Sequence, residues 1–174
     1  SLHDALPILL ILDQDSHPMQ DMVNNMLAAS ADFQAKGIRL AVVAPVYEDR
    51  ATGTRSGFVR LGWLDYKKQF VKSEQGPVEA DFVISSGSLI PVSALNEIGL
   101  IDEDLFIDHV DTEWCLRARS KGFKLFGIPS ARMFHSLGDK RKRIWFLRMR
   151  NVPYHSPFRY YYMIRNGILL QKRS

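Results

Sequence analysis

The sequence has few of the features that mark secreted, membrane-spanning or disordered proteins. Its 174 residues include one cysteine, Cys115, which excludes an internal disulfide and is consistent with a reducing compartment. No apolar run approaches the roughly 20 residues of a membrane helix. No secretory signal peptide is visible, since the apolar run at residues 8–12 is short and ends in acid. A globular domain built on a hydrophobic core is expected.

The composition fits that expectation, and the charge is unevenly spread. The chain is 46% hydrophobic and 24% charged, with a formal net charge of +4. Residues 138–174 carry ten Lys and Arg against one acid, whereas the preceding part is net acidic. A basic segment attracts phosphate groups, whether of anionic lipid, nucleic acid or nucleotide.

Alternating strand and helix patterns predict an α/β fold. An apolar strand at residues 8–12, a helix ending at Gly37 and a strand at residues 38–44 closed by Pro45 would form a βαβ unit. Such units build mostly parallel sheets covered by helices. Further strands are predicted at residues 58–64, 78–84, 123–128 and 131–134, and helices at 91–98, 111–121 and 158–170.

Two carboxylates, Asp13 and Asp15, follow directly on the first predicted strand. Open α/β sheets bind ligands outside the carboxyl ends of their strands, and paired carboxylates suit Mg²⁺ or Mn²⁺ carrying a diphosphate. A turn with a helix cap explains the same residues. The spacing alone leaves both interpretations open.

Three carboxylates, Asp108, Asp111 and Glu113, gather at the start of a predicted helix, where the helix dipole stabilises negative charge. One of them could act as a general base, or they could cap the helix and pair with nearby arginines such as Arg117. His135 follows an apolar strand, and a lone histidine in that position is more often structural than a ligand.

Five segments, in this order, resemble the family 2 glycosyltransferases of the GT-A fold, and most closely their bacterial rhamnosyltransferase branch. The segments are LLILDQDS, DFVISSGSLIP, GLIDEDLFIDHVDTEWCLRARSKGF, FHSLG and HSPFRYYYMIRN. The resemblance implies a GT-A-type mixed, mostly parallel sheet flanked by helices. It also implies a metal-dependent, inverting transfer of a sugar, from the donor dTDP-L-rhamnose, to a cell-surface glycan or lipid-linked acceptor.

The resemblance assigns roles to particular residues. Asp13 and Asp15 fall on the family's Asp-x-Asp motif, and His135 falls where a further ligand to Mg²⁺ or Mn²⁺ is supplied. Asp111 matches the aspartate of a Glu-Asp motif, the proposed base. The residues implied to bind donor or acceptor are Ser86, Gly87, Ser88, Trp114 and Arg117.

One departure concerns the base. The glutamate that precedes the motif aspartate in the family is Val110 here, so Asp108 and Glu113 stay as alternatives to Asp111.

A second departure concerns the start of the chain. Family members begin with a nucleotide-binding segment, whereas this chain starts at the Asp-x-Asp strand, so an N-terminally truncated enzyme is expected. Residues 1–7 are interpreted as non-native, residues 8–137 as the metal and acceptor half of the catalytic domain, and residues 138–174 as a basic, aromatic helical segment. The alternative is an inactive binding module for a sugar nucleotide or lipid diphosphate.

The basic segment leaves its partner open. It could hold the enzyme against the inner face of the membrane, or be a solvated face. Charge and aromatic residues also permit nucleic-acid binding, but no recognised motif supports it. A cytoplasmic location is expected.

Overall fold

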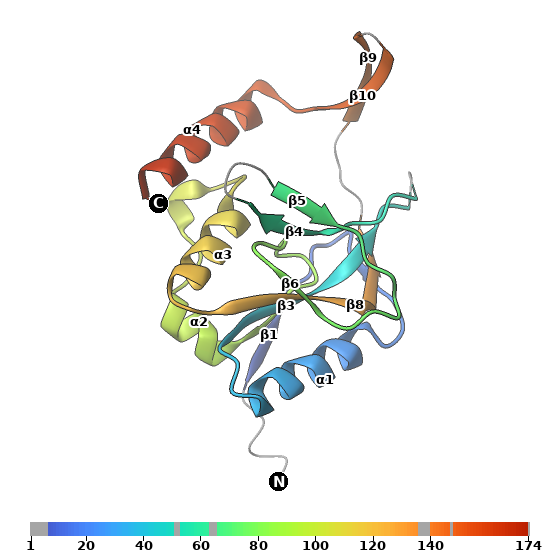
Figure 1. The fold of residues 1–174 in the computed structure, drawn as a ribbon. Helices are drawn as coiled ribbons and strands as arrows, with labels where there is room; N and C mark the ends of the chain where they lie inside the picture. Colours follow the sequence, from blue (N-terminus) through green and yellow to red (C-terminus); the bar gives the residue numbers. More distant parts are fainter. Residues whose placement is uncertain (1–6, 51–52, 63–65, 136–139, 147, 174) are drawn as a thin grey trace. The chain divides into compact units, whose positions relative to one another are not determined.

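The computed structural model describes residues 7–50, 53–62, 66–135, 140–146 and 148–173. It forms two compact units, one of Ser1–Ile101 with Asp111–Ser136, the other of Asp102–Val110 with Leu137–Ser174 (Figure 1). The interpretation of residues 1–7 as non-native falls, apart from Pro7, outside the described residues.

The first unit is built on a mixed sheet. Its strand order is β1 (Ile8–Leu10), β7 (Leu89–Pro91), β3 (Leu40–Glu48), β8 (Lys124–Phe134), β2 (His17–Pro18), and β6 (Val78–Ala80) also pairs with β8. Within the described residues only β3 and β8 pair in parallel, and the other pairings are antiparallel. The prediction of a mostly parallel sheet is therefore wrong. The strands β2, β6 and β7 have two or three residues each, too few to show a period-2 pattern in sequence.

The predicted βαβ unit exists with a strand inserted in its middle. Leu89 of β7 pairs with Leu10 of β1 on one side and with Val43 of β3 on the other. Pro45 does not end the second strand, because the β3–β8 ladder shifts register between Pro45 and Val46, and such an irregularity tolerates a residue without an N–H.

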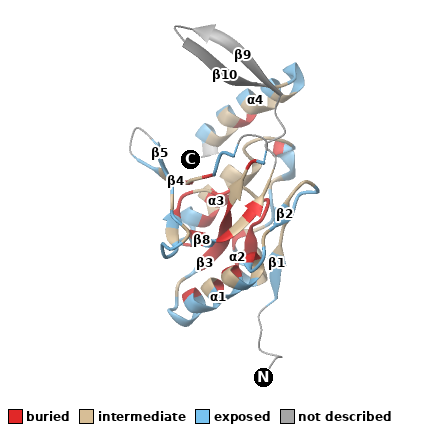
Figure 2. Ribbon diagram, turned by 90° about the vertical axis from the view of Figure 1, so that its right-hand side faces the viewer, coloured by how far each residue is buried: buried red, intermediate tan, exposed pale blue. Residues whose placement is uncertain are grey.

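Helices cover both faces of this sheet. The helix α1 (Met22–Ala35) shares a buried cluster with Phe126 of β8, whose ring stacks on Phe33 at 4.0 Å. The preceding residue of the strand, Leu125, belongs to a second cluster with α2 (Val92–Ile98) and α3 (Val110–Ser120). The buried residues accordingly concentrate along β3 and β8 (Figure 2).

A hairpin of β4 (Phe58–Leu61) and β5 (Tyr66–Gln69) forms a separate two-stranded sheet in the same unit. It was predicted only as one strand at residues 58–64. The ring of Phe58 lies so close over Gly127 of β8 that a Cβ at Gly127 would come within 2.2 Å of it. The hairpin is therefore seated on the main sheet through a glycine.

A buried carboxylate also fixes the hairpin. Asp81, 2% exposed, accepts the Leu61 N–H at 2.5 Å. Its other carboxylate oxygen lies 3.1 Å from Arg119 of α3 and 3.3 Å from Arg60 of β4, at ion-pair distance without hydrogen-bond geometry. Asp81 thus ties β4 to α3.

The second unit contains a short 3₁₀ helix (Glu103–Leu105), an antiparallel hairpin of β9 (Lys140–Phe146) and β10 (Arg148–Tyr154), and the helix α4 (Pro157–Arg173). The prediction of a helical segment over residues 138–174 is wrong for the hairpin, whose β-branched and aromatic residues favour strands. It is right from Pro157 on, where proline occupies the first helical position.

Helix α4 holds an irregular loop of its own unit. The buried Asn166 donates its side-chain N–H groups to the carbonyls of Leu105, Ile107 and Asp108 at 2.7, 2.9 and 3.0 Å, and Arg159 pairs with the Asp108 carboxylate at 3.0 Å. The residues of this loop with left-handed backbone are Phe106, Asp108 and His109. Such backbone persists where surrounding bonds hold it, which α4 provides.

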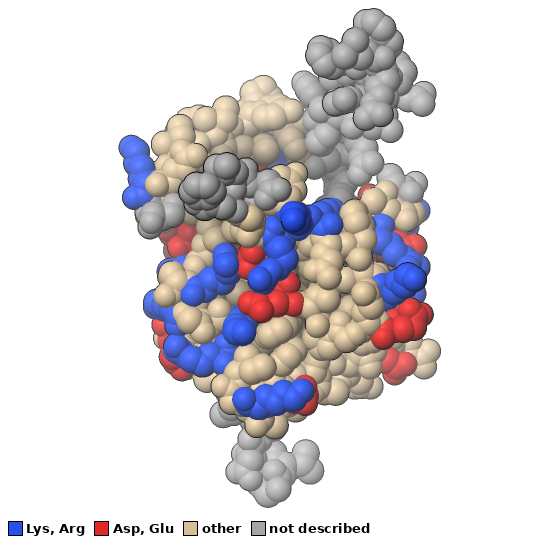
Figure 3. Space-filling model, in the orientation of Figure 1, with Lys and Arg blue, Asp and Glu red and all other residues tan. Residues whose placement is uncertain are grey.

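Basic and acidic side chains lie interspersed on the face of the described residues drawn in Figure 3. That face therefore carries no patch of a single sign. No helix in the described part of the chain is long and apolar enough to cross a membrane.

Candidate metal centre and active site

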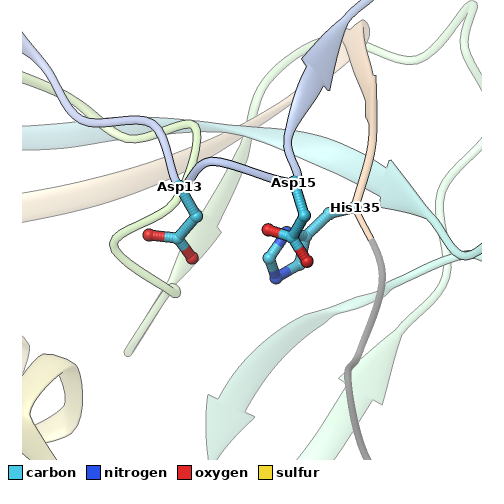
Figure 4. A group of neighbouring side chains, drawn as sticks. All are labelled: Asp13, Asp15 and His135. Atoms are coloured by element: carbon cyan, nitrogen blue, oxygen red, sulfur yellow. The ribbon is translucent and has the colours of Figure 1, made fainter.

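The structure brings Asp13, Asp15 and His135 together (Figure 4). One potential ligand atom from each lies within 4.8 Å of the others, and His135 Nδ1 is 3.3 Å from Asp15 Oδ1. The two aspartates follow β1, and His135 follows β8. The short strand β2 brings them together, because His17 pairs with Phe134 and so places the preceding turn beside the end of β8.

Two serines brace this group. Ser16 Oγ lies 3.0 Å from His135 Nδ1 and 2.6 Å from Ser86 Oγ, and Ser86 Oγ accepts the Asp13 N–H at 3.2 Å. Ser86 was expected to bind donor or acceptor, but it is buried and orients the turn. Ser16 was missed, although its place directly after Asp15 is the one available signal.

The neighbouring residues Gly87 and Ser88 are also buried. The Ser88 hydroxyl donates to Ile84 O at 2.6 Å, and the Gly87 N–H donates to Ile11 O at 2.8 Å. Gly87 has a φ of +81°, and a Cβ there would lie 2.6 Å from Met133 Sδ. This segment therefore packs the turn after β1 against the sheet and presents no free hydroxyl to a ligand.

The group offers a plausible donor set for a divalent cation. Among the side chains that the structure describes, no Lys or Arg pairs with Asp13 or Asp15. Because His135 Nδ1 is engaged by Ser16 and Asp15, Nε2 is the ring nitrogen left for coordination. Two carboxylates and an imidazole suit Mn²⁺, whereas Mg²⁺ prefers oxygen ligands alone.

Asp111, near the start of α3, is half-buried and has no Lys or Arg partner within the described part of the chain. Its Oδ2 accepts the Ser85 N–H at 3.1 Å. Burial raises the pKa of Asp111, the Ser85 hydrogen bonds oppose that rise, and the negative charge of Asp13 adds to it. Ser85 and Ser86 are neighbours in the chain, and they bind Asp111 and the backbone of Asp13 respectively, so Asp111 lies close to the turn that carries Asp13 and Asp15.

The two alternatives to Asp111 are held in ion pairs. Asp108, in the second unit, binds the Arg159 guanidinium through both carboxylate oxygens at 3.0 Å. Glu113 binds Arg117 one turn along α3 at 2.8 and 2.9 Å. Both carboxylates are occupied by a guanidinium, whereas Asp111 has no Lys or Arg partner among the described side chains, so Asp111 is the strongest of the three candidates for the base.

Trp114 and Arg117, expected near donor or acceptor, have contacts inside the protein. Trp114 is 4% exposed and donates its indole N–H to Gly99 O at 2.9 Å. Arg117 donates to Ile98 O at 2.9 Å and Leu100 O at 2.8 Å. Together they hold the end of α2 against α3.

Comparison with known proteins gives one curated relative. The dTDP-rhamnosyl transferase RfbF of Shigella flexneri is 31% identical over 175 residues. The chain is a homologue of this transferase. The match takes in 100% of the chain and 56% of the relative, so the chain spans about half the relative's length. The predicted resemblance to rhamnosyltransferases is confirmed, and no protein-family model matches the chain.

Solved structures support the fold. The crystal structure of GalNAc-T7 with UDP, GalNAc and Mn²⁺ has a TM-score of 0.56 at 17% identity, covering 74% of this chain and 27% of that one. A197 from STIV has a TM-score of 0.49 at 15% identity, covering 86% and 66%, a likeness too weak to build on. At such identity the first match shows a GT-A-like fold and nothing of substrate.

Proposed function

We propose that the protein is a metal-dependent glycosyltransferase that moves a sugar from a nucleotide diphosphate donor to a glycan or lipid-linked acceptor. The observation that carries this proposal is that the neighbouring residues Ser85 and Ser86 bind Asp111 and Asp13, which brings a half-buried carboxylate close to the group of Asp13, Asp15 and His135. The donor dTDP-L-rhamnose is supported by the homology to a dTDP-rhamnosyl transferase.

In this proposal Asp13, Asp15 and Nε2 of His135 hold Mn²⁺ or Mg²⁺. When bound, the cation neutralises the negative charge that builds up on the diphosphate leaving group. Ser16 and Ser86 keep the histidine ring and the aspartate turn in place, the part that outer hydrogen-bond partners play around metal ligands.

Asp111 then acts as the general base. Its carboxylate accepts the proton of the acceptor hydroxyl while that oxygen bonds to the anomeric carbon and the bond to the diphosphate breaks on the opposite face, inverting the carbon. A raised pKa makes the carboxylate a better proton acceptor near neutral pH. No enzyme nucleophile is needed, and burial, which raises the pKa of Cys115 to about 12, suits that thiol to packing.

The alternative is a binding module of the same fold without turnover. This alternative remains because the match covers 56% of the length of RfbF. Transfer by the 174-residue chain alone would exclude it. Metal-dependent donor binding without transfer, in both this chain and the native protein, would establish it.

The test of the metal group is Asp15→Ala, with Asp32→Ala of α1 as a matched control, because Asp32 is 53% exposed, pairs with Lys36 and is not part of the metal group. Titration calorimetry on the 174-residue chain should show that Asp15→Ala lowers the affinity for Mn²⁺. The loss should exceed the ~10–100-fold that follows from removing a hydrogen-bond partner of a metal ligand. The control should bind like the parent. Rhamnose transfer by the native protein should follow the same order, and full transfer by Asp15→Ala would refute the proposal.

A further inference from the structure

A cavity of about 250 Å³ lies in the first unit, between the end of β3 and the β4–β5 hairpin. Its inner wall includes Ala44, Pro45 and Tyr47 of β3, and its outer wall includes Tyr66 and Lys68 of β5. Drug-sized ligands occupy pockets of roughly 300–1,000 Å³. The cavity therefore has room for one small ring and not for a whole nucleotide.

The lining combines aromatic surface with a few polar groups. Tyr47, Phe58, Tyr66 and Phe82 are the aromatic residues of the lining and come from four different segments, and Lys68 is a cationic residue of the exposed hairpin. A pyranose ring has a C–H face that packs on aromatic rings and a rim of hydroxyls that hydrogen-bond to groups such as Lys and Tyr. Tyr66, whose residue is 69% exposed, gives the cavity an accessible aromatic wall.

The cavity adjoins both parts of the candidate active site. Tyr47, which lines it, packs edge-on against the His135 ring at 5.9 Å between centroids. Ile84, which also lines it, directly precedes Ser85, the residue whose N–H binds Asp111. A ring seated here would lie next to the candidate base, the group that must reach the acceptor hydroxyl.

We propose that this cavity binds a pyranose ring of the acceptor glycan. The proposal rests on the proposed function, because the metal group is reserved for the donor diphosphate and Asp111 for the acceptor hydroxyl. Tyr66 is the specificity-determining residue that the hairpin contributes, and its ring covers one side of the bound sugar.

The test is saturation-transfer NMR with the metal-free 174-residue chain and the methyl glycosides of L-rhamnose, D-glucose and N-acetyl-D-glucosamine. At least one glycoside should receive saturation. Tyr66→Ala should weaken its binding about fivefold, the size of one lost aromatic contact. The control is Tyr161→Ala of α4, because Tyr161 is 61% exposed and is not among the residues that line the cavity. It should bind like the parent.

Each other outcome overturns the proposal. Absence of saturation transfer from all three glycosides would show a cavity that takes no sugar. Equal effects of Tyr66→Ala and Tyr161→Ala would place binding elsewhere. Displacement of the glycoside by dTDP with Mn²⁺ would assign the cavity to the donor.

The result is separable from the proposed function. Failure of glycoside binding with intact, Asp15-dependent Mn²⁺ binding would remove the cavity assignment and leave the metal group standing. Failure of Asp15-dependent Mn²⁺ binding with intact, Tyr66-dependent glycoside binding would remove the metal group and leave the cavity assignment standing.

Discussion

Two aspartates of the first unit, Asp81 and Asp111, are both withdrawn from water, but their surroundings differ. Asp81 lies between the guanidinium groups of Arg60 and Arg119 and accepts a backbone N–H. Asp111 has the donors of Ser85 and the repelling charge of Asp13, and its pKa is raised. A buried carboxylate that pairs with arginines, as Asp81 does, joins parts of the fold. A buried carboxylate without such a partner, as Asp111 is among the described side chains, has the raised pKa that suits a general base.

The largest effect is expected from Asp111→Asn in the native protein. The amide has nearly the same size but cannot accept the acceptor's proton, so transfer should fall by about 10²–10⁴-fold, the usual contribution of a general base. Initial rates of dTDP release, with glycan extracted from the source organism as acceptor, measure the loss. Mn²⁺ binding by the variant should persist. A rate within a few-fold of the parent would remove Asp111 from this role.

Next comes Asp81→Ala, which leaves two arginines without their shared partner and Leu61 without an acceptor. We expect the free energy of unfolding to fall by about 2–4 kcal/mol. This is less than the loss for a fully buried ion pair, because Arg60 and Arg119 are 42% and 39% exposed. Urea denaturation of the 174-residue chain measures it. Glu79→Ala is the control, since Glu79 also pairs with Arg60 but is 42% exposed and should cost less than about 1 kcal/mol. Equal losses would show that burial does not distinguish these carboxylates.

A smaller effect concerns pH. The folded-state pKa of Asp111 is raised above its ordinary value of 3.8, so between the unfolded and folded pKa values the folded chain binds more protons. The free energy of unfolding therefore falls as pH rises through that window. Asp111→Asn removes this loss, so the variant should gain stability relative to the parent between pH 3 and pH 7. Paired urea titrations at both pH values check this, and a pH-independent difference would contradict it.

The smallest effect is expected from Glu113→Gln. Glu113 is already neutralised by Arg117, so transfer by the native protein should stay within about twofold of the parent, well below the 10²-fold loss that marks a general base. The same assay of dTDP release is used. A drop as large as that of Asp111→Asn would reverse the assignment of the base.

Part of the fold could be predicted because long apolar runs carry a readable pattern. The strands β3 and β8, the helices on both faces of the sheet and the proline start of α4 follow from such runs and caps. The antiparallel pairings could not be predicted, because β2, β6 and β7 are too short for periodicity and are defined only by the strands they join.

The candidate site shows the same division. Asp13, Asp15 and His135 were assigned to the metal by the resemblance to family 2 glycosyltransferases, because their place after strands left a turn and a structural histidine equally open. The Glu113–Arg117 pair fits the spacing of one helical turn. The Arg159 partner of Asp108 lies 51 residues away, and Ser86 lies 70 residues from Ser16, so no local pattern reveals either contact. Only the folded chain separates a free carboxylate from a paired one.

Gly127 has no side chain and does not line the cavity beside Tyr66, but it governs the position of one cavity wall. Phe58 can approach β8 this closely only because the position beneath its ring lacks even a methyl group. An alanine there would lift the hairpin that carries Tyr66, changing the fit of a sugar without touching it. A screen for variants with altered acceptor specificity could therefore select a substitution at Gly127, a residue of the main sheet that does not contact the substrate.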